Sequence, residues 1–146
     1  MTAYKSDQET KRTATPQKML GTNEHGGRVR VSYFNYTVPT ATLAVNDTLN
    51  LVTLPKGARI LRGHVAWEAM STAGGTAQIQ IGDGTTANKY LDTTSVDAAG
   101  SSAFADTIAL SYGEELSAET TLVAKAVGEA WAATKKIAGH VLWVVD

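Results

Sequence analysis

The sequence contains no cysteine among its 146 residues. Disulfide bonds and thiolate metal sites are therefore excluded, and cysteine usage does not indicate the compartment. Long apolar runs are missing as well: the longest, Val141 to Val145, is far shorter than the roughly 20 residues that a membrane span needs. The first ten residues are polar and lack the apolar centre of a secretion signal. We therefore expect a soluble protein that is made and folds in a cytoplasm.

Catalytic motifs are also missing. The three histidines, His25, His64 and His140, have no carboxylate or second histidine at ligand spacing, so each is interpreted as structural. The stretch from Gly82 to Thr86 lacks the lysine of a phosphate-binding loop and the alternating acidic residues of a calcium loop, and its Asp-Gly pair is typical of a hairpin turn. No Gly-x-Ser-x-Gly elbow is present. The sequence predicts no catalytic residue, no metal site and no cofactor.

Residues 1–27 contain few large apolar side chains, namely Tyr4, Met19 and Leu20. Such a segment buries too little surface to offset its ordering entropy, so it is either disordered or ordered by a partner. Residues 1–30 carry a net charge of +3, against −1 for the whole chain, which leaves −4 for the remainder. We predict an extended N-terminal arm over 1–27 and a single folded domain over 28–146, with an acidic neighbour as one possible docking site for the arm.

Period-two apolar patterns begin at Arg28 and predict β-strands through the rest of the chain. In the first strand the apolar residues keep one phase up to Tyr33 and take the opposite phase from Phe34, which predicts a β-bulge at this point. A second strand spans Asp47 to Leu54. The turn Pro55-Lys56-Gly57 then leads into a half-buried strand, from Ile60 to Met70.

Further strands follow at short intervals. Gly74-Gly75 predicts a hairpin into a strand from Thr76 to Ile81, and a short strand around Tyr90 is followed by a loop from Asp92 to Ser102. Alternation recurs at Ile108, Leu110 and Tyr112 and again around Leu122 to Val127. The last strand, Ile137 to Val145, is apolar on both faces and should therefore be central.

The fold class predicted from these seven or eight strands is all-β. No convincing helix is present, and short strands spaced by Gly and Ser turns indicate an antiparallel β-sandwich, jelly-roll-like, or a barrel. Alternating aromatic residues on a strand are usually core residues, which is the interpretation for Tyr33 and its aromatic neighbours, and also for Trp67 and Trp143. Trp131 lies in a turn region, where we expect it to be exposed and to anchor a partner, together with Lys135 and Lys136.

Four stretches of the sequence resemble one group of viral proteins. They are the entry Gly26 to Val31, the turn and strand Leu54 to Leu61, the pair Gly82 to Gly84 and Lys89 to Leu91, and the ending Val144-Val145-Asp146. In this order they resemble small structural proteins of tailed bacteriophages encoded near the major capsid protein. The resemblance covers nearly the whole chain, and its motifs belong to turns and strands, so no ligand or catalytic residue is carried over.

The resemblance implies a virion protein, most plausibly a capsid decoration or cement protein with a jelly-roll or related β-sandwich fold. Its partners would be the major capsid protein and copies of itself, as a homo-dimer or homo-trimer, with no nucleic acid, membrane or small-molecule substrate. The residues expected to reach a neighbouring subunit are those of the arm: Tyr4, Lys5, Lys11, Arg12, Lys18, Met19 and Leu20.

Two other functions remain open. A tail or fibre module that binds host saccharides would show exposed aromatic side chains beside Asp or Asn in one set of loops. A cupin-like metal enzyme on the same fold would need several inward-facing His or Glu residues, and the sequence offers no His-x-His spacing.

Overall fold

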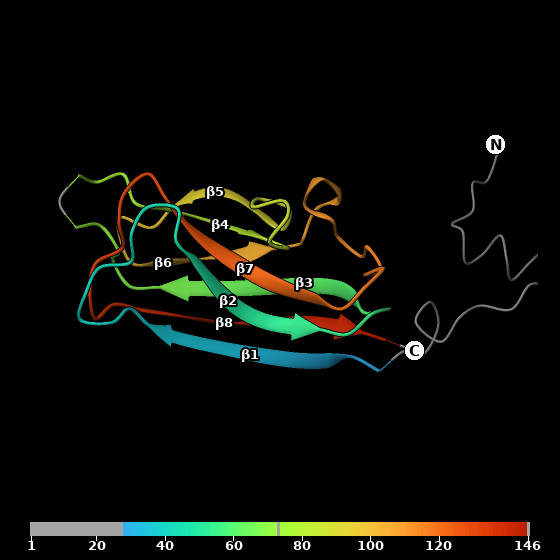
Figure 1. Cartoon of the computed structure of the whole chain (residues 1–146). Helices are drawn as coiled ribbons and strands as arrows, with labels where there is room; N and C mark the ends of the chain where they lie inside the picture. The colour runs from blue at the N-terminus through green and yellow to red at the C-terminus, as the bar shows by residue number, and fades with distance from the viewer. Residues whose placement is uncertain (1–27, 73, 146) are drawn as a thin grey trace, which may run out of the picture.

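The computed structural model describes residues 28–72 and 74–145, which form two stacked four-stranded β-sheets (Figure 1). All strand pairs are antiparallel. The elements in chain order are β1 (Arg30–Thr37), β2 (Thr48–Leu54), β3 (Arg59–Trp67), β4 (Gln78–Gly82), β5 (Leu91–Ser95), β6 (Gly100–Phe104), the 3₁₀ turn η1 (Ile108–Leu110), β7 (Thr120–Val127) and β8 (Lys136–Val144).

The strand orders are β1-β8-β3-β6 in one sheet and β2-β7-β4-β5 in the other. Most successive strands therefore lie in opposite sheets, which is the arrangement of an eight-stranded jelly roll. The predicted all-β sandwich is confirmed. The hairpin predicted at Gly74-Gly75 is wrong, because β3 and β4 belong to different sheets and do not pair with each other. The alternation in the sequence marks β4 as a strand but does not say which strand it pairs with.

The bulge predicted in the first strand is also wrong. β1 pairs with β8 in one continuous register from Arg30↔Trp143 to Thr37↔Lys136. The two apolar phases instead correspond to two faces of one strand: Phe34 is buried between the sheets, whereas Tyr33 points outward and is exposed. Register shifts occur elsewhere, at Asn50/Val52 in the β2–β7 pair and at Ile60/Arg62 in the β3–β8 pair.

β8 occupies the centre of its sheet, between β1 and β3, as its two apolar faces predicted. Gly139 is required there because β3 approaches closely. A Cβ atom at Gly139 would lie 2.1 Å from the carbonyl oxygen of His64 and 2.6 Å from the ring of Phe34. Val141 and Ile137, on the same face as Gly139, are buried in the core between the sheets.

The connections contain two further departures from expectation. The segment 92–102, predicted as a loop, contributes most of β5 and part of β6. The alternation at Ile108 to Tyr112 is not a strand: η1 forms there, and Ile108 is exposed. Among the described residues, no helix is long and apolar enough to cross a membrane.

Candidate partner-binding surfaces

Three connections meet at the end of the sandwich where β1 begins and β8 ends: the β2–β3 turn, the β4–β5 loop and the β6–β7 loop (Figure 1). Ion pairs join them. The Lys89 ammonium of the β4–β5 loop lies 3.1 Å from Glu114 and 3.4 Å from Asp83. Arg59, at the start of β3, donates to the Gly113 carbonyl at 2.7 Å and pairs with Glu115 at 3.1 Å. Two basic side chains therefore hold the β6–β7 loop against the sandwich.

The pKa values of this cluster follow from its contacts. The pKa of Glu114 lies below its ordinary value of 4.5, chiefly because the Ser111 side chain and then Lys89 donate to the carboxylate. Partial burial acts to raise the pKa of Asp83, but hydrogen bonds from the Thr86 and Thr85 N–H groups and from Lys89 outweigh it, so this pKa is lowered. Burial likewise acts to lower the pKa of Lys89, and its bonds to the carboxylates, Glu114 first, raise it overall.

The β6–β7 loop presents an apolar tip to solvent. Ile108 in η1 is 91% exposed and Tyr112 is 54% exposed. The tip has its own backbone hydrogen bonds, including Tyr112 N–H to the Thr107 carbonyl at 2.9 Å, and Gly113 N–H donates to Ile60 of β3 at 2.9 Å. An ordered loop that exposes a large aliphatic side chain is suited to insert into a socket on a partner, since little entropy is lost when it docks.

The predicted contact residues near the β7–β8 connection lie at the opposite end of the sandwich, where Lys136 pairs with Thr37 at the end of β1. The expected exposure of Trp131 is wrong. Its side chain is 0% exposed, and its indole N–H donates to the Gln78 carbonyl at 3.1 Å. Trp131 also exchanges backbone hydrogen bonds with Leu43, so it packs inside the end of the sandwich. Lys136 is exposed and Lys135 partly so.

The predicted contact residues of the arm, from Tyr4 to Leu20, lie outside the described residues. The structure does describe Arg28, the first residue after the predicted arm, which lies two residues before β1 begins at Arg30. The start of β1 is at the same end of the sandwich as the β6–β7 loop and the end of β8 (Figure 1).

A row of three rings crosses the outer face of the β1-β8-β3-β6 sheet. Tyr33 of β1 lies with its ring centroid 6.1 Å from that of His140 in β8, which lies 6.0 Å from that of His64 in β3. Tyr33 is 77% exposed, so the prediction that it belongs to the core is wrong. His64 and His140 are directly opposed cross-strand partners. The sequence could not pair them because the strand register was unknown.

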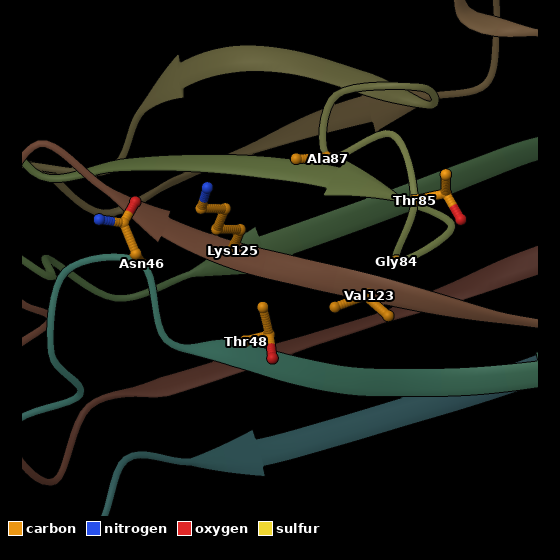
Figure 2. A pocket seen from close by; sticks show the side chains of 7 residues that line it. All are labelled: Asn46, Thr48, Gly84, Thr85, Ala87, Val123 and Lys125. Atoms are coloured by element: carbon orange, nitrogen blue, oxygen red, sulfur yellow. The ribbon is translucent and has the colours of Figure 1, made fainter.

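A pocket of about 250 Å³ lies on the outer face of the other sheet, where β2 and β7 approach the β4–β5 loop (Figure 2). Lys125 of β7 is its cationic side chain. The lining residues are Asn46, Thr48, Gly84, Thr85, Ala87, Val123 and Lys125. None of them is aromatic, so the pocket lacks the stacking surface that a saccharide-binding module would require.

The Gly82 to Thr86 stretch is a structural turn. Asp83 Oδ1 accepts hydrogen bonds from the N–H groups of Thr85 at 3.0 Å and Thr86 at 2.8 Å, and Oδ2 faces Lys89. Across residues 28–72 and 74–145, no group of three or more His, Cys, Asp or Glu side chains is placed to hold a metal ion.

Comparison with solved structures places this fold among chains of phage capsids. A chain in the asymmetric unit of the cyanophage Pam1 capsid matches with a TM-score of 0.72 and 23% identity, over 92% of this chain and 98% of that one. A chain in the capsid of Ralstonia phage GP4 matches with a TM-score of 0.69 and 21% identity, over 82% and 86% of the two chains. A chain in the acid-stable capsid of Helicobacter pylori bacteriophage KHP30 matches with a TM-score of 0.59 and 19% identity, over 80% and 87%.

At these identities the comparison establishes a shared fold over 80% or more of both chains in each match. No protein-family model matches the sequence, and no curated protein matches it.

The β6–β7 tip and the outer face of β1 are the surfaces that sequence reasoning missed. Ile108 follows a strand-like alternation, and only its exposure in the folded structure identifies it. For β1, the signal was present in the two apolar phases, which describe two faces when the register is continuous.

Proposed function

We propose that this chain is a bacteriophage virion structural protein, a capsid decoration (cement) protein. It binds the outer shell and fastens neighbouring capsid subunits. It works by binding, without turnover, at the capsid surface of the virion. Its partners are the major capsid protein and further copies of itself.

The observation that carries this proposal is the shared jelly-roll fold. Chains of three phage capsid structures have this fold along 86% or more of their own length. These similarities support a virion role but do not distinguish the shell from its decoration. The resemblance of the sequence to small phage structural proteins favours decoration, and so does the size of the chain, a single sandwich domain preceded by a polar segment.

The geometry supports a binding role. The end of the sandwich where the arm joins also presents the apolar tip of the β6–β7 loop, so the arm and the tip can engage one partner surface together. Two weak contacts on one chain raise the effective concentration of each other, and a protein that binds only the assembled shell stabilises it by mass action. Within this proposal, Lys135 and Lys136 are a second contact at the far end.

The test is the copy number of the chain in purified virions, measured by quantitative mass spectrometry against the major capsid protein. Parity with the capsid protein, or a simple fraction of it, supports decoration. A few copies per particle would favour the tail or fibre alternative, and absence from the virion would overturn the proposal. Virions that lack the chain should release their contents at a lower temperature than complete virions.

A further inference from the structure

The four edge strands of the sandwich are protected to very different degrees. The edges are β1 and β6 in one sheet and β2 and β5 in the other. Short strands, bulges and charged side chains are the usual devices that stop edge strands from pairing with other chains. β5 and β6 have five residues each, and β5 carries Asp92. β2 has a register shift at Asn50/Val52.

β1 has the least of these protections. It is eight residues long, it is unbulged against β8, and between Arg30 and Thr37 it carries no charged side chain other than Arg30 at its first position. In the first half of β1, the side chains on the outer face are apolar: Val31 is 45% exposed and Tyr33 is 77% exposed. Val29, just before the strand, extends this apolar row.

The open edge of β1 can be assigned residue by residue. Val38 N–H donates to Lys135 in the β8 direction at 2.8 Å. Because backbone groups alternate in direction along a strand, the even-numbered residues of β1 face β8 and the odd-numbered residues present N–H and C=O to the open edge. These odd-numbered residues are Val29, Val31, Tyr33, Asn35 and Thr37. They are exposed, and among the described residues no backbone hydrogen bond satisfies their outward groups.

We propose that β1 pairs with β1 of a second copy in an antiparallel arrangement, with Tyr33 of each copy opposite Tyr33 of the other. In this register Val31 faces Asn35 and Val29 faces Thr37, so every open-edge residue meets another open-edge residue. About ten backbone hydrogen bonds would form between the two β1 strands. The β1-β8-β3-β6 sheets of the two copies would then form one continuous eight-stranded sheet, with a twofold axis between the copies. The apolar rows of the two copies meet at the axis, where Tyr33 packs on Tyr33.

The charges along β1 are compatible with a second copy in this orientation. Each strand is basic at its start, from Arg28 and Arg30, and neutral towards Thr37. Antiparallel pairing centred on Tyr33 places Arg30 of one copy opposite Tyr36 of the other. The two Arg30 residues are then six strand positions apart, about 20 Å. That distance is about two and a half times the screening length of about 8 Å at physiological salt, so the basic ends do not oppose the pairing.

The absence of cysteine makes a direct test possible, since a single introduced thiol can only pair with its copy. In the full-length protein, Tyr33→Cys should form a disulfide-linked dimer on mild oxidation, because Cα atoms about 5.5 Å apart lie within the range that a disulfide spans. Val31→Cys is the matched control on the same edge. Its two copies would be four strand positions apart, about 13 Å, and should not cross-link.

Sedimentation equilibrium gives the second readout. Wild-type protein should show a monomer–dimer equilibrium, and Tyr33→Lys, which places two like charges at the axis, should weaken it at least about tenfold. Ser117→Lys adds the same charge at an exposed loop position and should leave it unchanged. A wild-type monomer at all concentrations, a trimer insensitive to Tyr33→Lys, or equal cross-linking of the two cysteine variants would each overturn the proposal. The test needs no capsid, so its failure leaves the proposed virion role standing.

Discussion

Trp131 connects three parts of the sandwich that are distant in sequence. Its backbone exchanges hydrogen bonds with Leu43 in the β1–β2 connection, and its indole N–H donates to Gln78 at the start of β4. With 0% exposure, it is one of the largest fully buried side chains among the described residues. Its role is therefore to fill the core at the end of the sandwich where β8 begins. Without the indole ring, the residues packed around it at this end would border a cavity.

Replacement of Trp131 should destabilise the domain rather than weaken a contact. Trp131→Ala should lower the free energy of unfolding by about 3–5 kcal/mol, because a large cavity is left between the sheets. Trp131→Phe should cost less, with about 1–2 kcal/mol of its effect arising from the unpaired Gln78 carbonyl. Urea unfolding followed by far-UV circular dichroism measures both. An unchanged midpoint for Trp131→Ala, with weaker partner binding, would contradict the buried role.

At the scale of elements, the loops at the end where β1 begins are joined by charged groups in addition to their buried apolar residues, such as Tyr90 and Leu116. Asp83, Lys89 and Glu114 come from the β4–β5 and β6–β7 loops, and all three are at least partly accessible to solvent. Because each of their pKa values moves in the direction that favours the charged form, each of the three groups stabilises the folded loops while it is ionised.

The cluster predicts a specific pH dependence of stability. The lowered pKa values of Asp83 and Glu114 mean that the unfolded chain binds more protons in acid, so their contribution is complete above about pH 4.5 and is lost as the pH falls through the lowered folded values. The raised pKa of Lys89 has the opposite sign: its contribution is complete below 10.5 and is lost as the pH rises through the folded value.

Lys89→Met should reduce the pH dependence of unfolding stability both in acid and in alkali, since it removes the cation that Asp83 and Glu114 share. The measurement is the urea midpoint from pH 2.5 to pH 11 for the wild type and Lys89→Met. Lys56→Met, in the neighbouring β2–β3 turn, is the control for loss of a positive charge and should keep the pH dependence in both ranges. A Lys89→Met profile with the same slopes as the wild type would show that the cluster does not couple to folding.

The β6–β7 tip makes a different prediction, because Ile108 contributes to no core. Ile108→Asp should change the free energy of unfolding by no more than about 0.5 kcal/mol. Under the proposed function it should reduce the occupancy of the chain on shells reconstituted from virions that lack it, by about tenfold or more, as expected for an anchor residue.

Val45→Asp is the matched control for Ile108→Asp. Val45 is also an exposed aliphatic residue in a connection, but it lies between β1 and β2 at the other end of the sandwich. Equal loss of shell occupancy for both variants would indicate a general charge effect, and no loss for Ile108→Asp would exclude the tip as a shell contact.

At the scale of the whole molecule, the hydrophobic core is continuous and is built from residues between Phe34 and Trp143. Both sheets contribute to it, and the buried positions come from strands and from the connections at both ends. The described residues therefore form a continuous core among themselves, and under the proposed function residues 1–27 serve a partner.

Deletion of residues 1–27 should separate folding from binding. The truncated protein should keep its far-UV spectrum and a free energy of unfolding within about 1 kcal/mol of the full chain, because the core of the described domain is built from residues 34–143. Under the proposed function, it should bind reconstituted shells at least about tenfold more weakly, since one of two linked contacts is lost. Full binding by the truncated protein would show that the arm does not reach the shell, whereas failure to fold would contradict the predicted domain boundary.

Local patterns in the sequence were sufficient for the fold class. Period-two alternation located β3, β7 and β8, and the two apolar faces of β8 placed it at the centre of a sheet, because side-chain direction alternates strictly along a strand. Local alternation did not predict which strands pair with each other. The crossing from β3 to β4, the opposition of His64 and His140, and the burial of Trp131 all depend on residues far apart in the chain.

The same distinction between local patterns and contacts of distant residues applies to the candidate surfaces. By itself, the sequence determined an all-β domain without cysteine chemistry and identified a polar segment before it, since composition and alternation are local properties. Only the tertiary structure decided which apolar side chains remain outside. Ile108 and Tyr33 belong to apolar patterns like those of the core, and they are exposed because, within residues 28–72 and 74–145, no layer covers the outer face of either sheet or the β6–β7 tip.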